Sequence, residues 1–112
     1  MRYILILFAL LLACSQPAEP PANVIAGVGS YAVRDGGHYH ITAWVDTTQA
    51  SDYLSMSVII DQWIGWQSVI PGGAERLIFE FETPPNIGEP GGEYLVRAHS
   101  NNETIEQTGI LP

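Results

Sequence analysis

Two of the three histidines in the chain stand two residues apart, a spacing that can build a metal site. His38 and His40 would lie on one face of a β-strand, because side chains i and i+2 of a strand point the same way. Imidazole nitrogens are common zinc ligands, and a third one from His99 would require its strand to neighbour the first. No acidic or thiol residue completes a diagnostic spacing, so we expect ordinary surface histidines and no bound metal.

Carboxylates can supply acid–base chemistry, but their arrangement does not favour an enzyme. Glu80 and Glu82 alternate on one strand face, where they could pair as the acids of a glycosidase do. Alternating glutamates on an exposed face more often serve solubility and protect a sheet edge. The chain also has no Gly-x-Ser-x-Gly elbow and no Gly-rich loop that opens a helix to hold phosphate. We therefore predict a protein without catalytic activity and without a cofactor.

Tryptophan is the residue type in this chain best suited to ligand contact. Trp63 and Trp66 flank Ile64-Gly65 in a segment whose polar and apolar residues alternate poorly, so at least one tryptophan should face solvent. Trp44 falls on the polar face of its own strand. Exposed tryptophans stack on sugar rings and anchor protein interfaces. The structural alternative is that they cover the core between two sheets.

The single cysteine, Cys14, follows an unbroken apolar run from Tyr3 to Ala13. That run is too short to cross a bilayer, which takes about 20 helical residues, and it suits the core of a signal peptide. Leu11-Leu12-Ala13-Cys14 resembles the lipobox of bacterial lipoproteins. The resemblance implies that residues 1–13 are a cleaved signal peptide and that Cys14 carries the lipid that anchors the protein in the bacterial envelope.

Residues 14–22 are expected to link this anchor to the folded part. Ser15 stands where the inner-membrane retention signal of lipoproteins carries aspartate, so the resemblance implies the outer membrane. Three prolines between Ser15 and Ala22 favour an extended polyproline II tether. The mature domain would then be periplasmic or exposed on the surface.

The acidic composition excludes several partners. Twelve Asp and Glu residues stand against four Lys and Arg, which gives a formal net charge of -8. Nucleic acid and anionic lipid headgroups are bound through clustered basic side chains, so we expect neither. Membrane association is expected to come from the lipid anchor.

From Asn23 onward, short apolar runs alternate with turn residues, which indicates an all-β domain. Four clean period-2 segments predict strands at 38–46, 53–61, 76–82 and 93–99. Three less regular segments, 24–33, 63–70 and 103–110, bring the total to about seven. The side chains expected to face inward are Tyr39, Ile41, Ala43, Val45, Leu54, Met56, Val58, Ile60, Leu77, Phe79, Phe81, Tyr94, Val96 and Ala98.

Glycine-rich turns separate these segments. Asp35-Gly36-Gly37, Pro71-Gly72-Gly73 and Pro90-Gly91-Gly92 are each expected to supply backbone of positive φ. The proline-rich stretch from Thr83 to Gly92 should cross from one sheet to the other.

A strand that reads Gly-Gly-Glu-Tyr-Leu-Val-Arg-Ala after a proline-rich crossover is similar to the penultimate strand of bacterial Ig-like and fibronectin-type domains. The Pro-Gly-Gly turn and Asn101-Asn102-Glu103 resemble the cell-adhesion-related domain found in bacteria. The resemblance covers residues 23–112 and implies an antiparallel Ig-like β-sandwich.

Together these features predict a lipid-anchored, non-catalytic envelope protein that acts as a protein-binding or structural accessory module. The alternative is a glycan-binding surface module that uses Trp44, Trp63 and Trp66.

Overall fold

The computed structural model describes residues 23–112, so the predicted signal peptide, Cys14 and the tether lie outside the described residues. Within residues 23–112 no helix has the length and hydropathy needed to span a membrane. The seven strands are β1 (Ile25–Asp35), β2 (His38–Thr47), β3 (Leu54–Ile60), β4 (Trp63–Val69), β5 (Arg76–Glu82), β6 (Glu93–Ser100) and β7 (Glu103–Ile110). The predicted all-β domain of about seven strands is confirmed.

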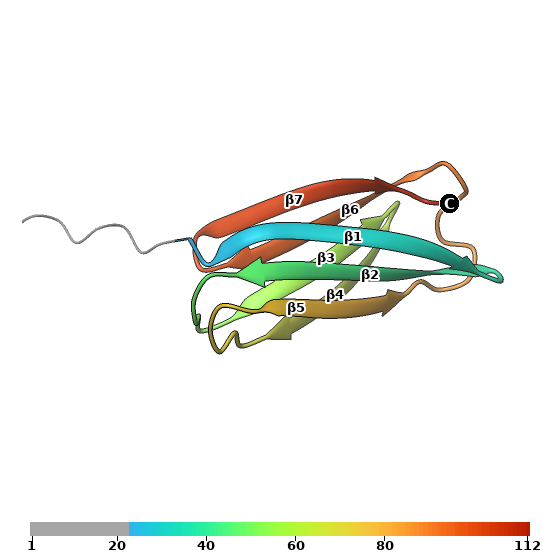
Figure 1. The fold of residues 1–112 in the computed structure, drawn as a ribbon. Helices are drawn as coiled ribbons and strands as arrows, with labels where there is room; N and C mark the ends of the chain where they lie inside the picture. Colours follow the sequence, from blue (N-terminus) through green and yellow to red (C-terminus); the bar gives the residue numbers. More distant parts are fainter. Residues whose placement is uncertain (1–22) are drawn as a thin grey trace, which may run out of the picture.

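The strands pair antiparallel in two sheets. Sheet A has the order β1-β2-β5, and sheet B has the order β4-β3-β6-β7. Figure 1 shows β1, β2 and β5 in front of β3, β4 and β6, with β7 beside β1. The connection from β5 to β6 passes from sheet A to sheet B, as its prolines predicted.

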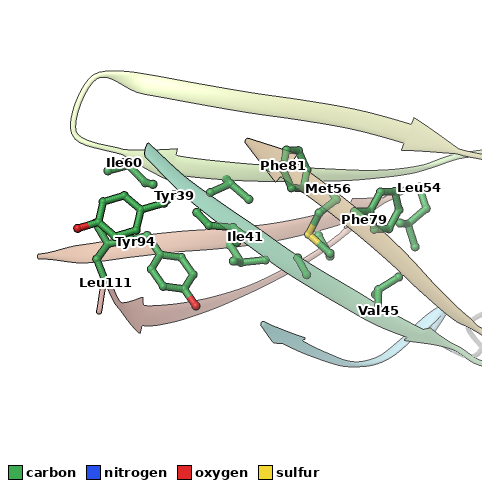
Figure 2. Close-up of a cluster of buried hydrophobic side chains, with 14 of the residues drawn as sticks. Tyr39, Ile41, Val45, Leu54, Met56, Ile60, Phe79, Phe81, Tyr94 and Leu111 are labelled. Carbon is green, nitrogen blue, oxygen red and sulfur yellow. The ribbon is translucent and has the colours of Figure 1, made fainter. Parts of the chain in front are cut away.

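One hydrophobic core lies between the two sheets (Figure 2). Alternate residues of β2, β3, β5 and β6 contribute to it, because successive side chains of a strand point to opposite faces. The predicted inward faces are confirmed, although Leu77 is only partly buried where it packs against the cluster. The cluster consists of Ile25, Tyr39, Ile41, Ala43, Val45, Leu54, Met56, Val58, Ile60, Phe79, Phe81, Tyr94, Val96, Ala98 and Leu111.

Two aromatic side chains cover glycines where the edges of the sheets approach each other. A Cβ atom on Gly109 of β7 would lie 2.2 Å from Cζ of Tyr94, and the Tyr94 hydroxyl lies 3.0 Å from Oγ of Ser30 on β1. A Cβ atom on Gly65 would lie 2.7 Å from Cη2 of Trp63. The glycines therefore leave room for rings that fill the two edges of the core, a device known from other sheets.

Glu103 holds the start of β1 against the start of β7. Its carboxylate accepts hydrogen bonds from the backbone N–H groups of Val24, at 2.9 Å, and Ile25, at 3.2 Å. These contacts join residues almost 80 positions apart at the point where the chain enters the domain.

Glu103→Ala is expected to loosen this junction. Hydrogen bonds to charged groups contribute about 1.5–3 kcal/mol to stability, so the free energy of unfolding should fall by about that amount. Hydrogen exchange at the amides of Val24 and Ile25 should accelerate. The control is Glu106→Ala on the same strand, whose carboxylate pairs with Arg97 instead. Unchanged exchange at both amides in Glu103→Ala would show that the carboxylate does not hold β1.

The turns agree only in part with their prediction. Gly36 and Gly91 adopt positive φ, at 65° and 85°, as expected. The prediction was wrong for Pro71-Gly72-Gly73, where neither glycine does. This connection is a wider loop, and the Gly73 carbonyl accepts a hydrogen bond from Oγ1 of Thr47 at 2.6 Å, so a side chain holds it in place of a tight reversal. Positive φ angles occur in addition at Gly88 and at the non-glycine residues Asp61, Asn86 and Asn101.

Candidate functional site

The three histidines lie on opposite sides of the molecule. His38 and His40 are on the outer face of sheet A, because the residues between and beyond them on β2 are buried. His99 is on the outer face of sheet B, because β6 belongs to that sheet and the neighbours Ala98 and Ser100 are buried. Among residues 23–112 no three His, Cys, Asp or Glu side chains are grouped to hold a metal ion.

His40 stands between the two glutamates that the sequence singled out. Its Nε2 atom lies 3.8 Å from Oε1 of Glu80, and its Nδ1 atom lies 3.8 Å from Oε1 of Glu82. Both distances exceed the range of an N–H···O hydrogen bond, and both glutamates are exposed. These three groups form a loose polar cluster on an open surface, where ion pairs contribute little to stability.

The three tryptophans occupy three different places. Trp44 is half-buried on the outer face of sheet A, and Trp66 is exposed on the outer face of sheet B. Trp63 points to the inner side of β4 and packs against the core. Within residues 23–112 the three tryptophans therefore do not form one site, and each has its own set of neighbours.

Trp44 belongs to an aromatic platform on the outer face of sheet A, which we define as Tyr31, Trp44 and Ile78. The register places Trp44 between Gly29 of β1 and Ile78 of β5. The ring centroids of Tyr31 and Trp44 are 6.2 Å apart, with the ring planes tilted by 50°. Tyr31 is 53% exposed and Ile78 is 64% exposed.

An ion pair borders this platform. Arg76 donates two hydrogen bonds to the Asp46 carboxylate, from Nε at 2.7 Å and from Nη2 at 3.0 Å. The guanidinium carbon lies 5.6 Å from the centroid of the Trp44 ring, within the range of a cation–π contact. The hydrogen bond from Arg76 lowers the pKa of Asp46, and the same bond raises the pKa of Arg76.

This pair predicts a pH dependence of stability. A lowered folded-state pKa stabilises the fold above the ordinary aspartate value of about 3.9, and the effect disappears as the pH falls through the folded-state value. The decrease in melting temperature on acidification from about pH 6 to about pH 2.5 should therefore be smaller in Asp46→Asn than in the wild type. Asp52→Asn, at an exposed position of the β2–β3 connection, serves as the control. Equal decreases in the wild type and in Asp46→Asn would refute the stabilising role of the pair.

Sheet B carries an apolar patch on its outer face, which joins Trp66, the solvent-facing tryptophan expected from the sequence, to three residues that sequence reasoning did not identify. We define it as Ile59, Ile64, Trp66 and Leu95. The register places Ile64 opposite Ile59 and Ile59 opposite Leu95, so three neighbouring strands form one apolar row. Trp66 extends the row along β4. Ile64 is 63% exposed and Trp66 is 62% exposed.

The surroundings of this patch are polar and mostly acidic. Ser57 lies opposite both Trp66 and Arg97, and Arg97 pairs with Glu106 of β7 at 3.4 Å. Asp61 follows the end of β3, and Glu93 begins β6 next to Leu95. The patch thus has an apolar centre and a charged rim, the usual anatomy of a protein interface.

No protein-family model, curated protein or solved structure matches the chain.

Proposed function

We propose that the protein is a lipid-anchored, non-catalytic accessory module of the bacterial envelope, and that the apolar patch on sheet B docks a protein partner. Cys14 is the anchor in this proposal, and residues 14–22 are the tether. We place the anchor in the outer membrane, because Ser15 stands where the inner-membrane retention signal carries aspartate.

The anchor is supported by the resemblance of Leu11-Leu12-Ala13-Cys14 to a lipobox and by the absence of any second cysteine in the sequence. A lone thiol in an oxidising compartment has no disulfide partner in its own chain, and acylation consumes it. Each buried methylene of an acyl chain adds about 0.8 kcal/mol of membrane affinity.

Metabolic labelling tests the anchor. Cells grown with radioactive palmitate should incorporate label into the wild-type chain and not into Cys14→Ser. The control is the full-length chain carrying an unrelated surface substitution, Ile78→Ser, which should keep the label. Label that persists in Cys14→Ser would refute acylation at this residue.

The fold type in the proposal is Ig-like. Sheet orders β1-β2-β5 and β4-β3-β6-β7 support it, because β1, β2 and β5 then correspond to strands A, B and E of an Ig domain. Strands β3, β6 and β7 correspond to C, F and G, with β4 added beside C. Domains of this architecture serve many functions, and the residues of the surface determine what binds there.

The observation that carries the docking proposal is the exposure of Ile64 and Trp66 beside Ile59 and Leu95. Single exposed apolar residues are normal, but a contiguous patch rimmed by polar groups marks an interaction site. Tryptophan is enriched among the residues that dominate binding energy at interfaces.

Charge defines the chemistry of the partner. The chain has a formal net charge of -8, and Asp61, Glu93 and Glu106 stand near the patch against Arg97. Two copies of an acidic chain repel each other, whereas a basic surface is attracted to it and steered into contact. The proposed partner is therefore an envelope protein whose contact surface has an apolar centre and a lysine- or arginine-rich rim.

Two isoleucines with nearly equal exposure provide a matched test. Ile64→Ser removes an apolar side chain from the patch, and Ile78→Ser removes one from the outer face of sheet A. Full-length protein carrying either change is used to recover partners from detergent-solubilised envelopes. Recovery of a basic protein should fall at least about tenfold with Ile64→Ser, a change of about 1.4 kcal/mol, and stay unchanged with Ile78→Ser.

Two results would contradict the docking proposal. Equal recovery of the partner with Ile64→Ser and Ile78→Ser would show that the partner does not bind through the sheet B patch. Recovery of a second copy of this chain through the patch would identify self-association instead of a basic partner.

A further inference from the structure

Trp44 is held in a fixed position on sheet A by three independent contacts. A Cβ atom on Gly29 would lie 2.3 Å from Cε2 and Cζ2 of Trp44, so the indole rests directly on the glycine backbone. Tyr31 lies beside it, and Arg76 lies over it. Asp46 in turn holds Arg76 through two hydrogen bonds. A ring that is already ordered loses little conformational entropy when a ligand binds.

The platform also projects from an open sheet face. Trp44, Tyr31 and Ile78 belong to three neighbouring strands, and the latter two are more than half exposed. Figure 1 shows β1, β2 and β5 side by side on this side of the molecule. Such a surface offers an aromatic face to a ligand that lies along it.

Hydrogen-bonding groups border the platform. Asp46 and Arg76 form the row on one side of Trp44. Glu80 lies in the row on the other side, across from Thr42, and His40 stands between Glu80 and Glu82. Carboxylates accept hydrogen bonds, and the guanidinium group donates them in a planar fork. The face therefore combines an apolar ring surface with both donors and acceptors at its margin.

We propose that this platform binds a neutral glycan. A pyranose ring has an apolar face of C–H bonds, which packs on the exposed Tyr31 ring, on Ile78 and on the part of Trp44 that Gly29 and Arg76 leave uncovered. Its rim of hydroxyl groups exchanges hydrogen bonds with Asp46, Arg76, Glu80 and His40. A few placed polar groups around an aromatic surface are what small-molecule sites use to fix orientation.

Charge selects the class of glycan. Asp35, Asp46, Glu80 and Glu82 lie on this face, and Asp46 and Glu80 flank Trp44 while Arg76 is already paired with Asp46. Uronic acid or sulfated polymers would meet the carboxylates of this face, while the Arg76 guanidinium is already paired with Asp46, and would therefore be repelled. The open surface suits the side of an extended chain of several sugar units. Glycan binding here is independent of the protein docking at sheet B, because the two surfaces are the opposite outer faces of the molecule.

Isothermal titration of the full-length protein with cellohexaose and chitohexaose tests the proposal, with an oligogalacturonate of equal length as the anionic probe. At least one neutral oligosaccharide should bind, and the anionic one should not. Trp44→Ala and Tyr31→Ala should each weaken binding by about tenfold, since aromatic contacts of this kind dominate such sites. Gly29→Val should weaken it too, because the added side chain displaces the indole.

Trp66→Ala is the matched control and should bind like the wild type, and circular dichroism confirms that each variant is folded. Three results would overturn the proposal: no binding of either neutral oligosaccharide, binding that Trp44→Ala leaves unchanged, or binding that Trp66→Ala removes. The last result would place the glycan on sheet B. None of these results affects the test of protein docking through Ile64.

Discussion

Truncation of Trp66 to alanine is expected to weaken docking of the protein partner by about 30-fold or more. Trp66 is the largest exposed side chain of the sheet B patch, and it adjoins the apolar row of Ile64, Ile59 and Leu95. Truncating a residue that dominates an interface costs at least about 2 kcal/mol of binding free energy. Each 1.4 kcal/mol corresponds to about a factor of ten in affinity. The stability of the fold should change little, because surface substitutions usually stay within about 0.5 kcal/mol.

The partner is the protein whose recovery depends on Ile64. Its affinity is measured by titration with the wild-type protein and with Trp66→Ala. Trp44→Ala is the control, since it removes a tryptophan from the other sheet. A loss of affinity of the same size in both variants would indicate a general effect on the fold. An unchanged affinity in Trp66→Ala would show that Trp66 does not contribute to the interface.

Ile41→Ala is expected to lower the free energy of unfolding by about 2–5 kcal/mol. Ile41 is fully buried on β2, the central strand of sheet A, and its cross-strand neighbours are Ala32 and Phe81. The truncation removes apolar contacts and leaves a cavity that a tightly packed core cannot close. A domain of this size should lose about 10 °C or more in melting temperature.

Urea denaturation followed by circular dichroism measures this change. Ile78→Ala makes the same side-chain truncation at an exposed position of the same sheet and should shift stability by no more than about 0.5 kcal/mol. Equal losses in the two variants would contradict the assignment of Ile41 to the core and of Ile78 to the surface.

The strands could be predicted from the sequence because their side chains alternate. Tyr39, Ile41, Ala43 and Val45 occupy every second position of β2 and are buried, and the same period recurs in β3, β5 and β6. This alternation also specifies which face is buried. It predicted the core residues of β2, β3, β5 and β6, but not Ile25 and Leu111, which lie outside these alternating segments.

The partners of each strand could not be predicted, and the candidate sites depend on them. His99 has the same outward orientation on β6 that His40 has on β2, but β6 belongs to sheet B. The two histidines are therefore on opposite outer faces. The sheet B patch was missed for the same reason: Ile59 and Leu95 are outward positions whose contact follows only from the pairing of β3 with β6.

The glycines that make room for aromatic rings could not be predicted from the sequence either. Gly29 is next to Trp44 only in the paired strands, and Gly109 is next to Tyr94 in the same way. A glycine within a strand indicates a close approach without naming the group that approaches. The positive φ expected at Pro71-Gly72-Gly73 was wrong because the composition of a turn does not fix its length or its contacts.

The most direct test of the account is photo-cross-linking in living cells with a benzophenone amino acid placed at Ile64 and, as the matched control, at Ile78. Both positions are about equally exposed, on opposite faces. The account predicts one basic envelope protein cross-linked from position 64, absent from position 78, and lost in the Cys14→Ser background because the chain no longer resides at the membrane. The same protein cross-linked equally from both positions, or a cross-link that Cys14→Ser leaves unchanged, would contradict it.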